Sequence, residues 1–347
     1  MDAKKWSCIL IITLVALLVF LAGTMYFLDP FLRYGKESPP LTYYAYNEMY
    51  SNPGIARHYE YDSVLVGTSM IESTSVDLCD ELLGTDMIRL PYSGGTSYNM
   101  KTILDICFES PNEIRSVYWE LDEFQLTNSA VEPRYPLPTY LYESQHRHDL
   151  SYLLNLDIFY HYVLKDVWYT LAGQIQPAER RGIELTGNFG RDVLLSTYSR
   201  PELSEKQTVF EGSSMQKALE ANLKNIQTEV EAHPDTQFHF FLVPFSILYW
   251  DRELRNGTFD AAMDCLKQAL KTLVAYDNVT VYFYQCEPEI ITNLDNYKDY
   301  SHYGSWINDT LTRFMAERKN IVTENNYEEY VDTLSVFVHS YDFESIF

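Results

Sequence analysis

Short apolar runs alternate with longer amphipathic stretches along most of the chain. Five runs rich in Val, Ile, Phe and Tyr are typical of buried strands, and they lie at residues 63–66, 87–90, 116–121, 237–243 and 279–284. Apolar residues at helical spacing predict helices between them, at residues 69–83, 98–108, 213–231 and 259–275. This alternation favours an α/β fold with a doubly wound parallel sheet and helices on both faces. Ligand sites in such sheets lie at the carboxyl ends of the strands, near the switch in strand order.

The N-terminal segment has a different pattern, because no residue from Trp6 to Leu28 is charged. Its length matches the roughly 20 residues that cross a bilayer core, so we expect one transmembrane helix. Lys4 and Lys5 precede it, and the positive-inside rule then places the N-terminus in the cytoplasm and the main domain outside. A cleaved signal peptide is the alternative, but the run is long for one and lacks a good cleavage site. We expect a single-pass membrane protein with an extracytoplasmic domain.

These patterns divide the chain into segments. We expect a cytoplasmic tip and transmembrane helix at residues 1–28 and a juxtamembrane segment at 29–60, of which 30–56 is predicted to lie on the surface because Pro, Tyr and Asn are frequent there. The main domain is predicted at 61–347. An aromatic stretch interrupts its rhythm at about 129–201, which we interpret as an insertion. Its aromatic residues either pack the insertion onto the body or line a substrate channel.

Composition narrows the classes of partner. The chain has 49 Asp and Glu against 26 Lys and Arg, a formal charge of −23, which disfavours nucleic acid as a partner. Its five cysteines form no C-x-x-C pair and have no His at zinc-ligand spacing, so we predict neither a metal site nor an obligatory disulfide. No motif indicates a cofactor.

The candidate catalytic residues lie near the start and near the end of the predicted sheet region along the sequence. Ser69 directly follows the first strand and the pair Gly67-Thr68, where a tight turn can expose a serine hydroxyl at the start of a helix. A nucleophilic serine needs a base, and Asp299-Tyr-Ser-His302 supplies an imidazole with a carboxylate three residues earlier. Because both segments follow strands, we expect them at the same sheet edge. The simpler alternative is that Ser69 and His302 only cap the helices that follow them.

The motifs resemble those of a known family. Residues 64–69, Val-Leu-Val-Gly-Thr-Ser, resemble the first block of the SGNH (GDSL-like) hydrolases, with Gly-Thr-Ser in place of Gly-Asp-Ser, and Asp299-x-x-His302 resembles the last block. The resemblance spans about residues 62–311 and implies a flavodoxin-like three-layer fold with a Ser69-His302-Asp299 triad. With its N-terminal helix, the chain is also similar to the exported SGNH-like proteins that take part in O-acylation of bacterial cell envelope and exopolysaccharide. These proteins work beside membrane-bound O-acyltransferases.

The chain departs from the family at the oxyanion site. Pro91, which has no amide hydrogen, stands near the glycine of the family's second block, so the amides of Gly94 and Gly95, with that of Ser69, are the expected donors. Where the third block usually has Asn, this chain has Glu120 and Asp122. These acids would repel a developing oxyanion unless they are protonated or point away.

The resemblance therefore implies a serine esterase or O-acyltransferase that acts outside the cytoplasm on acyl esters of envelope glycan or exopolysaccharide. An acylated carbohydrate or a small ester is the expected substrate, the membrane is contacted through the N-terminal helix, and a membrane-bound O-acyltransferase is a possible partner. The alternative is a non-catalytic SGNH-like module that binds glycan or such an acyltransferase. The irregular second and third blocks favour this alternative.

Overall fold

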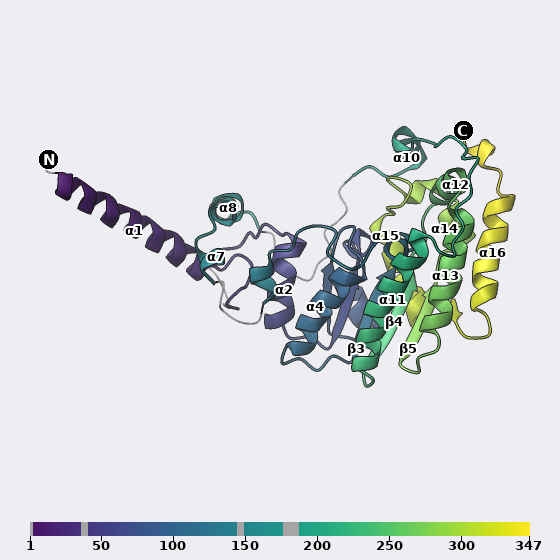
Figure 1. Ribbon diagram of the computed structural model, residues 1–347, viewed down its shortest axis with the longest axis horizontal. Helices are drawn as coiled ribbons and strands as arrows, with labels where there is room; N and C mark the ends of the chain where they lie inside the picture. Colours follow the sequence, from purple (N-terminus) through teal and green to yellow (C-terminus); the bar gives the residue numbers. More distant parts are fainter. Residues whose placement is uncertain (1–2, 36–40, 144–148, 176–186) are drawn as a thin grey trace. The chain divides into compact units, whose positions relative to one another are not determined.

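The computed structural model describes residues 3–35, 41–143, 149–175 and 187–347, which form two units (Figure 1). The larger unit comprises Glu60–Phe108, Asn112–Pro136 and Arg180–Phe347 and holds a six-stranded sheet in the order β2-β1-β3-β4-β5-β6. Neighbouring strands are parallel from β2 to β5, and β6 is antiparallel to β5. The strands are β1 Ser63–Gly67, β2 Met87–Pro91, β3 Ser116–Leu121, β4 Gln237–Leu242, β5 Val279–Phe283 and β6 Ile321–Val322.

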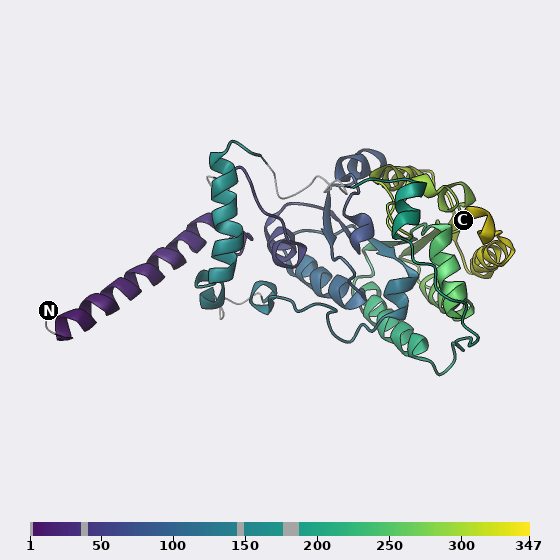
Figure 2. The ribbon, with the colours of Figure 1, turned by 90° about the horizontal axis from the view of Figure 1, so that it is seen from above.

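Helices cover both faces of this sheet, which confirms the predicted α/β fold. Figure 2 shows α4, α11 and α13 on one face and α3 and α15 on the other. All five residues of β1 and of β2 are buried, as continuous apolar runs in a covered parallel sheet predict. The helices of this unit are α3 Val76–Leu83, α4 Ser97–Glu109, α5 Glu123–Thr127, α10 Arg191–Thr197, α11 Ser214–Ala232, α12 Ile247–Asn256, α13 Phe259–Leu273, α14 Pro288–Ile291, α15 Ser305–Ala316 and α16 Tyr327–Ser340.

The helix predicted over residues 69–83 is two separate pieces. A 3₁₀ turn, η1, covers Ser69–Ile71, and α3 begins only at Val76. The hydroxyl of Ser75 accepts a hydrogen bond from the Leu78 amide at 3.2 Å and so caps the start of α3. The prediction of one continuous helix was wrong because a local cap competes with helix propagation. Ser69 therefore lies on a short turn of its own.

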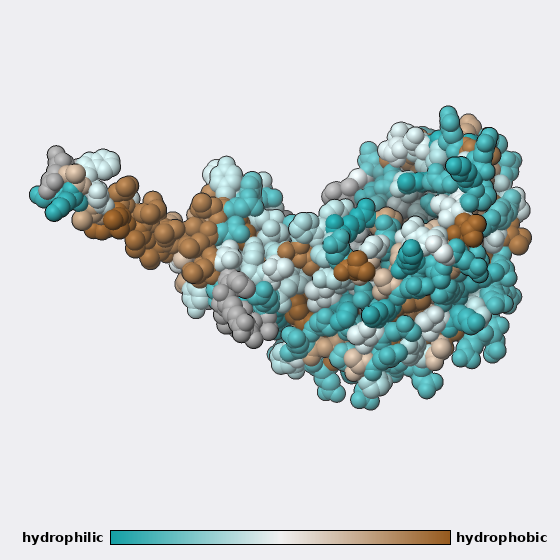
Figure 3. Space-filling model, viewed as in Figure 1, coloured by the Kyte–Doolittle hydropathy of each residue, from teal (hydrophilic) through white to brown (hydrophobic). Residues whose placement is uncertain are grey.

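The smaller unit comprises Met1–Tyr59, Glu109–Pro111 and Leu137–Glu179. Its first helix, α1 Ala3–Leu28, has 26 residues and is long and apolar enough to cross a membrane. The brown surface of α1 in Figure 3 shows this apolar character. The other helical elements are α2 Glu48–His58, α6 Thr139–Tyr142, α7 Asp149–Leu153, α8 Leu156–Ile158, the π-helical turn η3 Phe159–Val163 and α9 Leu164–Leu171.

Residues 30–56 are not simply a surface segment, so that prediction was wrong for much of the described part. The Asp29 carboxylate accepts hydrogen bonds from the amides of Arg33, at 2.8 Å, and Tyr34, at 2.9 Å, which folds the chain back after α1. Phe31 is buried, and α2 buries six consecutive residues from Ser51 to Ala56. The Pro and Gly inside α2 hide its helical character from sequence patterns. Residues 36–40 lie outside the described part of the chain.

The aromatic residues of the predicted insertion have two different environments. Phe159 and Tyr162 pack against a cluster that includes Phe31 and Tyr152. Tyr160 and Trp168, on the same helical stretch, are 67% and 70% exposed. Packing therefore accounts for only some of these rings.

Candidate active site

Ser69 lies where the sheet changes its strand order. It follows the carboxyl end of β1, whose neighbours are β2 and β3, and this is the switch point at which doubly wound sheets bind ligands. The hydroxyl of Thr68 accepts a hydrogen bond from the Met70 amide at 3.4 Å and caps η1. A Cβ atom on Gly67 would lie 2.6 Å from the Cβ atom of Glu120, so only glycine fits at this turn. The turn thus leaves the Ser69 side chain half-buried at the sheet edge.

Asp299 and His302 lie on the loop that precedes α15. One oxygen of the Asp299 carboxylate, Oδ1, accepts hydrogen bonds from the amides of Ser301, at 2.9 Å, and His302, at 2.8 Å. The same carboxylate contacts His302 Nδ1 at 2.9 Å. Because a carboxylate only accepts, Nδ1 carries the proton and Nε2 presents its lone pair. The short spacing of the motif therefore orients the imidazole ring.

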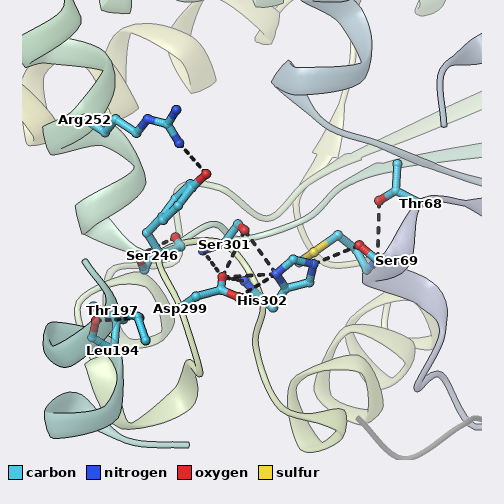
Figure 4. A network of polar contacts seen from close by, with 11 residues as sticks. Thr68, Ser69, Leu194, Thr197, Ser246, Arg252, Asp299, Ser301 and His302 are labelled. Atoms are coloured by element: carbon cyan, nitrogen blue, oxygen red, sulfur yellow. Dashed lines mark hydrogen bonds and ion pairs between the residues drawn. The ribbon is translucent and has the colours of Figure 1, made fainter. Parts of the chain in front are cut away.

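The structure brings the three predicted residues together (Figure 4). The Ser69 hydroxyl lies 2.9 Å from His302 Nε2, the ring nitrogen opposite the one that Asp299 holds. Burial raises the pKa of Asp299, but hydrogen bonds and charge from His302 outweigh burial and hold that pKa well below its ordinary range. Asp299 is thus charged at neutral pH. The arrangement has the geometry of a serine, a general base and a group that orients the base.

Two polar residues tie the segments of this site to one another. Asn308, on α15, donates from Nδ2 to the Met70 carbonyl at 3.0 Å and to the Ser73 hydroxyl at 3.1 Å, linking the helix after His302 to the turn that holds Ser69. The hydroxyl of Ser246 donates to the Tyr300 carbonyl at 2.6 Å, joining the end of β4 to the Asp299 loop. Both side chains are buried. Sequence patterns did not indicate either contact, because its partners are far apart along the chain.

A cavity of about 230 Å³ adjoins the Ser69 hydroxyl. Its wall combines the hydroxyl and imidazole groups with aromatic rings, and the residues that line it are Thr68, Ser69, Met70, Gly94, Asp122, Phe124, Phe245, Tyr249, Tyr300, Ser301 and His302. A few convergent polar groups in an otherwise apolar pocket are typical of small-molecule sites.

Two amides could stabilise negative charge in this cavity. Among the described residues, neither the Ser69 nor the Gly94 amide donates to a protein acceptor, and both residues line the cavity. The prediction for Gly95 needs correction, because its amide donates to the Tyr92 carbonyl at 2.7 Å and does not face the cavity. Gly94 adopts a φ of +63°, which favours glycine, and Gly95 closes the turn. The candidate oxyanion donors are therefore Ser69 and Gly94.

The two acids of the third block have separate roles. Glu120 points away from the cavity and is fully buried, and its Oε2 accepts hydrogen bonds from the Thr68 amide, at 2.8 Å, and hydroxyl, at 3.0 Å. Its Oε1 has no hydrogen-bond partner at ordinary distance within the described ranges. Burial, and next the charge of Asp122, raises the pKa of Glu120 well above its usual value. Glu120 therefore supports the Ser69 turn, and its burial favours the protonated form.

Asp122 does line the cavity, and its side chain accepts a hydrogen bond from the Gln125 amide at 2.6 Å, capping α5. Burial raises the pKa of Asp122 to about 6. Next to it, burial and the charge of Glu253 raise the pKa of Glu123 to about 8, and the Tyr249 hydroxyl donates to its carboxyl group. The acids near the cavity thus hold protons more tightly than ordinary carboxyl groups. This weakens the repulsion that they would exert on an oxyanion.

Positive charge also lies beside the cavity. The Arg134 guanidinium stacks 4.6 Å from the centre of the Phe124 ring, and the Arg252 guanidinium stacks 4.8 Å from the centre of the Tyr300 ring. Arg252 also donates to the Tyr300 hydroxyl (Figure 4).

In the described part of the chain, no His, Cys, Asp and Glu side chains form a group of three or more that could hold a metal ion.

Comparison with known proteins adds one likeness. The chain is similar to a solved structure described as "a putative platelet activating factor from Streptococcus pneumonia", with 11% sequence identity over 84% of this chain and 91% of that chain and a TM-score of 0.38. No family model matches the chain, and no curated protein matches it. Because the identity and the TM-score are both low, this likeness says nothing about the reaction that the chain carries out.

Proposed function

We propose that this protein is a serine esterase or O-acyltransferase of the SGNH type. Ser69 is the nucleophile and His302 is the general base. Asp299 orients the imidazole and stabilises its charged form. The observation that carries the proposal is the chain of contacts from the Ser69 hydroxyl to His302 Nε2, at 2.9 Å, and from His302 Nδ1 to Asp299, also at 2.9 Å. A serine that only caps a helix has no need of an imidazole held in this way.

The reaction follows from these positions. His302 Nε2 takes the proton of the Ser69 hydroxyl as its oxygen bonds to the ester carbonyl carbon, and the amides of Ser69 and Gly94 stabilise the oxyanion. The ester bond then breaks, and the leaving alcohol takes the proton from His302. Water or a sugar hydroxyl attacks the acyl-enzyme in the same way and frees Ser69. Hydrolysis and transfer differ only in which of these acceptors the cavity admits.

The setting of this activity is part of the proposal. We infer that α1 anchors the chain with its N-terminus in the cytoplasm, because Lys4 and Lys5 precede the apolar run. The acyl esters of envelope glycan or exopolysaccharide are then the substrate class, with a membrane-bound O-acyltransferase as a partner. Mass spectrometry of polysaccharide from a strain that lacks the gene tests this part. An unchanged acylation pattern would contradict it.

A fluorophosphonate probe tests the chemistry, because it bonds covalently to activated serines. The full-length protein in detergent is expected to be labelled, and Ser69→Ala is expected to lose the label completely. Ser301→Ala tests whether the other serine that lines the cavity carries the label; because the Ser301 hydroxyl donates to Asp299 at 3.1 Å, this variant is expected to be labelled more slowly. It is expected to keep the label. If well-folded protein is not labelled, the non-catalytic alternative is favoured, in which Pro91 and Asp122 mark a site that binds glycan without cleaving it.

A further inference from the structure

The helical stretch of α8, η3 and α9 presents apolar side chains to solvent along one side. Leu156, Tyr160, Leu164, Trp168 and Leu171 follow one another at intervals of three or four residues, which places them on one face of a helix. Their exposed fractions run from 43% for Leu164 to 80% for Leu171. We call these five residues the outer stripe. An exposed row of this kind is unusual for a helix that faces only water.

The opposite side of the same stretch is also apolar, and it has a partner. Ile158 and Val163 are buried in a cluster with Leu21 and Met25 of α1. The π-helical turn η3 lies in the middle of the stretch, and its wider turn keeps Leu156, Tyr160 and Leu164 in line at intervals of four. The inner side thus accounts for the fold of the unit. The outer stripe makes no contribution to that packing.

The position of the stretch relative to α1 suggests what covers the outer stripe. Residues 3–20 of α1 are exposed, whereas Leu21 and Met25 are buried by the rest of the unit. The body of the unit therefore begins at the last two turns of α1. Figures 1 and 2 together show α8 and α9 running across that end of α1 and not along it. If α1 crosses the bilayer, a helix in this position lies parallel to the membrane at its surface.

We propose that α8, η3 and α9 form an interfacial helix whose outer stripe is inserted into the lipid surface from which α1 emerges. The stripe includes a Tyr and a Trp, the side chains that prefer the boundary between acyl chains and head groups. Exposed Asp157, His161 and Lys165 lie between its members and can face the head groups. Because the apolar stripe drives the insertion, phosphatidylcholine, which is zwitterionic and has no net charge, is sufficient. This proposal depends on the membrane anchor and not on the proposed reaction.

Quenching of Trp168 fluorescence by brominated lipid tests the proposal. The full chain is placed in phosphatidylcholine nanodiscs in a Trp6→Phe background, which removes the tryptophan of α1. Lipid brominated near the head group is expected to quench the fluorescence of the parent at least twofold more than that of Trp168→Phe. In the parent, this lipid is also expected to quench more strongly than lipid brominated at the end of the acyl chain. Leu164→Glu with Leu171→Glu puts charges into the stripe and is expected to reduce the quenching. Lys224→Gln, at an exposed position on α11 of the larger unit, is the control and is expected to leave the quenching unchanged.

Two other results would overturn the proposal. If brominated lipid has no effect on Trp168 while aqueous acrylamide quenches it, the stripe faces water. If neither quencher reaches Trp168 and the result depends on the number of protein molecules in each disc, a second copy of the chain covers the stripe. All substituted side chains are exposed, so a circular dichroism spectrum equal to that of the parent is expected in each variant.

Discussion

Two aspartates of the site have pKa values that are shifted in opposite directions. Asp299 lies on a loop with its side chain 31% exposed, and His302 holds its pKa below the ordinary range. Asp122 follows β3, is 3% exposed, and has its pKa raised to about 6 by burial. The carboxylate with the lowered pKa therefore contacts the imidazole of His302, and the carboxylate with the raised pKa lines the cavity. Environments that separate the pKa values of like groups in this way are typical of acid–base sites.

The largest effect is expected when the carboxylate of Asp299 is removed. Asp299→Asn removes the carboxylate, and its amide group favours the tautomer of His302 in which Nε2 carries the proton and cannot accept one from Ser69. The rate of fluorophosphonate labelling is expected to fall by roughly 10³ to 10⁴. Asp309→Asn, on α15 and not among the residues that line the cavity, is the control and should label like the parent. Equal rates in both variants would show that Asp299 has no part in activating Ser69.

Two substitutions of Glu120, the buried acid that supports the Ser69 turn, test the acids with raised pKa values. Glu120→Ala removes the acceptor of both Thr68 hydrogen bonds, so the turn that holds Ser69 loosens and labelling is expected to slow by about 10- to 100-fold. Glu120→Gln keeps an oxygen for Thr68 and resembles the protonated acid, so labelling is expected within about threefold of the parent. The two thermal midpoints, measured in the same detergent, separate a loosened turn from a lost fold. A Gln variant as slow as the Ala variant would mean that Glu120 is charged.

Sequence patterns predicted the elements with repetitive character better than the contacts between them. The five parallel strands lie within about a residue of their predicted ends, because buried strands are continuous apolar runs. The antiparallel strand β6 has two residues, too few for any periodicity. Ser69, Asp299 and His302 could be selected because their spacing and order are characteristic, although their catalytic role stays a prediction.

The support of the site could not be read from the sequence. Glu120 reaches Thr68 because β1 and β3 pair in a register that sets Val66 beside Trp119, and this register depends on the whole sheet. The same is true of Asn308, whose contact with Met70 joins residues that are 238 positions apart. Gly95 was a plausible donor by type, but its amide is used inside its own turn, which only coordinates reveal.

An effect on stability, and not on labelling, is expected from Glu123, the buried acid next to Asp122. Because the pKa of Glu123 is about 8 in the folded protein and near 4.5 when unfolded, the folded state binds the proton more tightly between these values. The unfolding free energy should therefore fall as pH rises from 5 to 8, by about 1.4 kcal/mol for each unit by which the pKa is raised. Glu123→Gln keeps an acceptor for Tyr249 and cannot ionise, so it should reduce this slope, as urea unfolding in detergent at several pH values would measure.

Glu220, an exposed acid on α11, supplies the control, because Glu220→Gln should leave the slope as it is in the parent. Asp299 does not confuse the result, since its lowered pKa affects stability only at pH values below the ordinary range of an aspartate. An identical slope in Glu123→Gln and the parent would mean that Glu123 is charged despite its burial. Burial would then not be the dominant influence on the acids of this region, and the contrast with Asp299 would lose its physical basis.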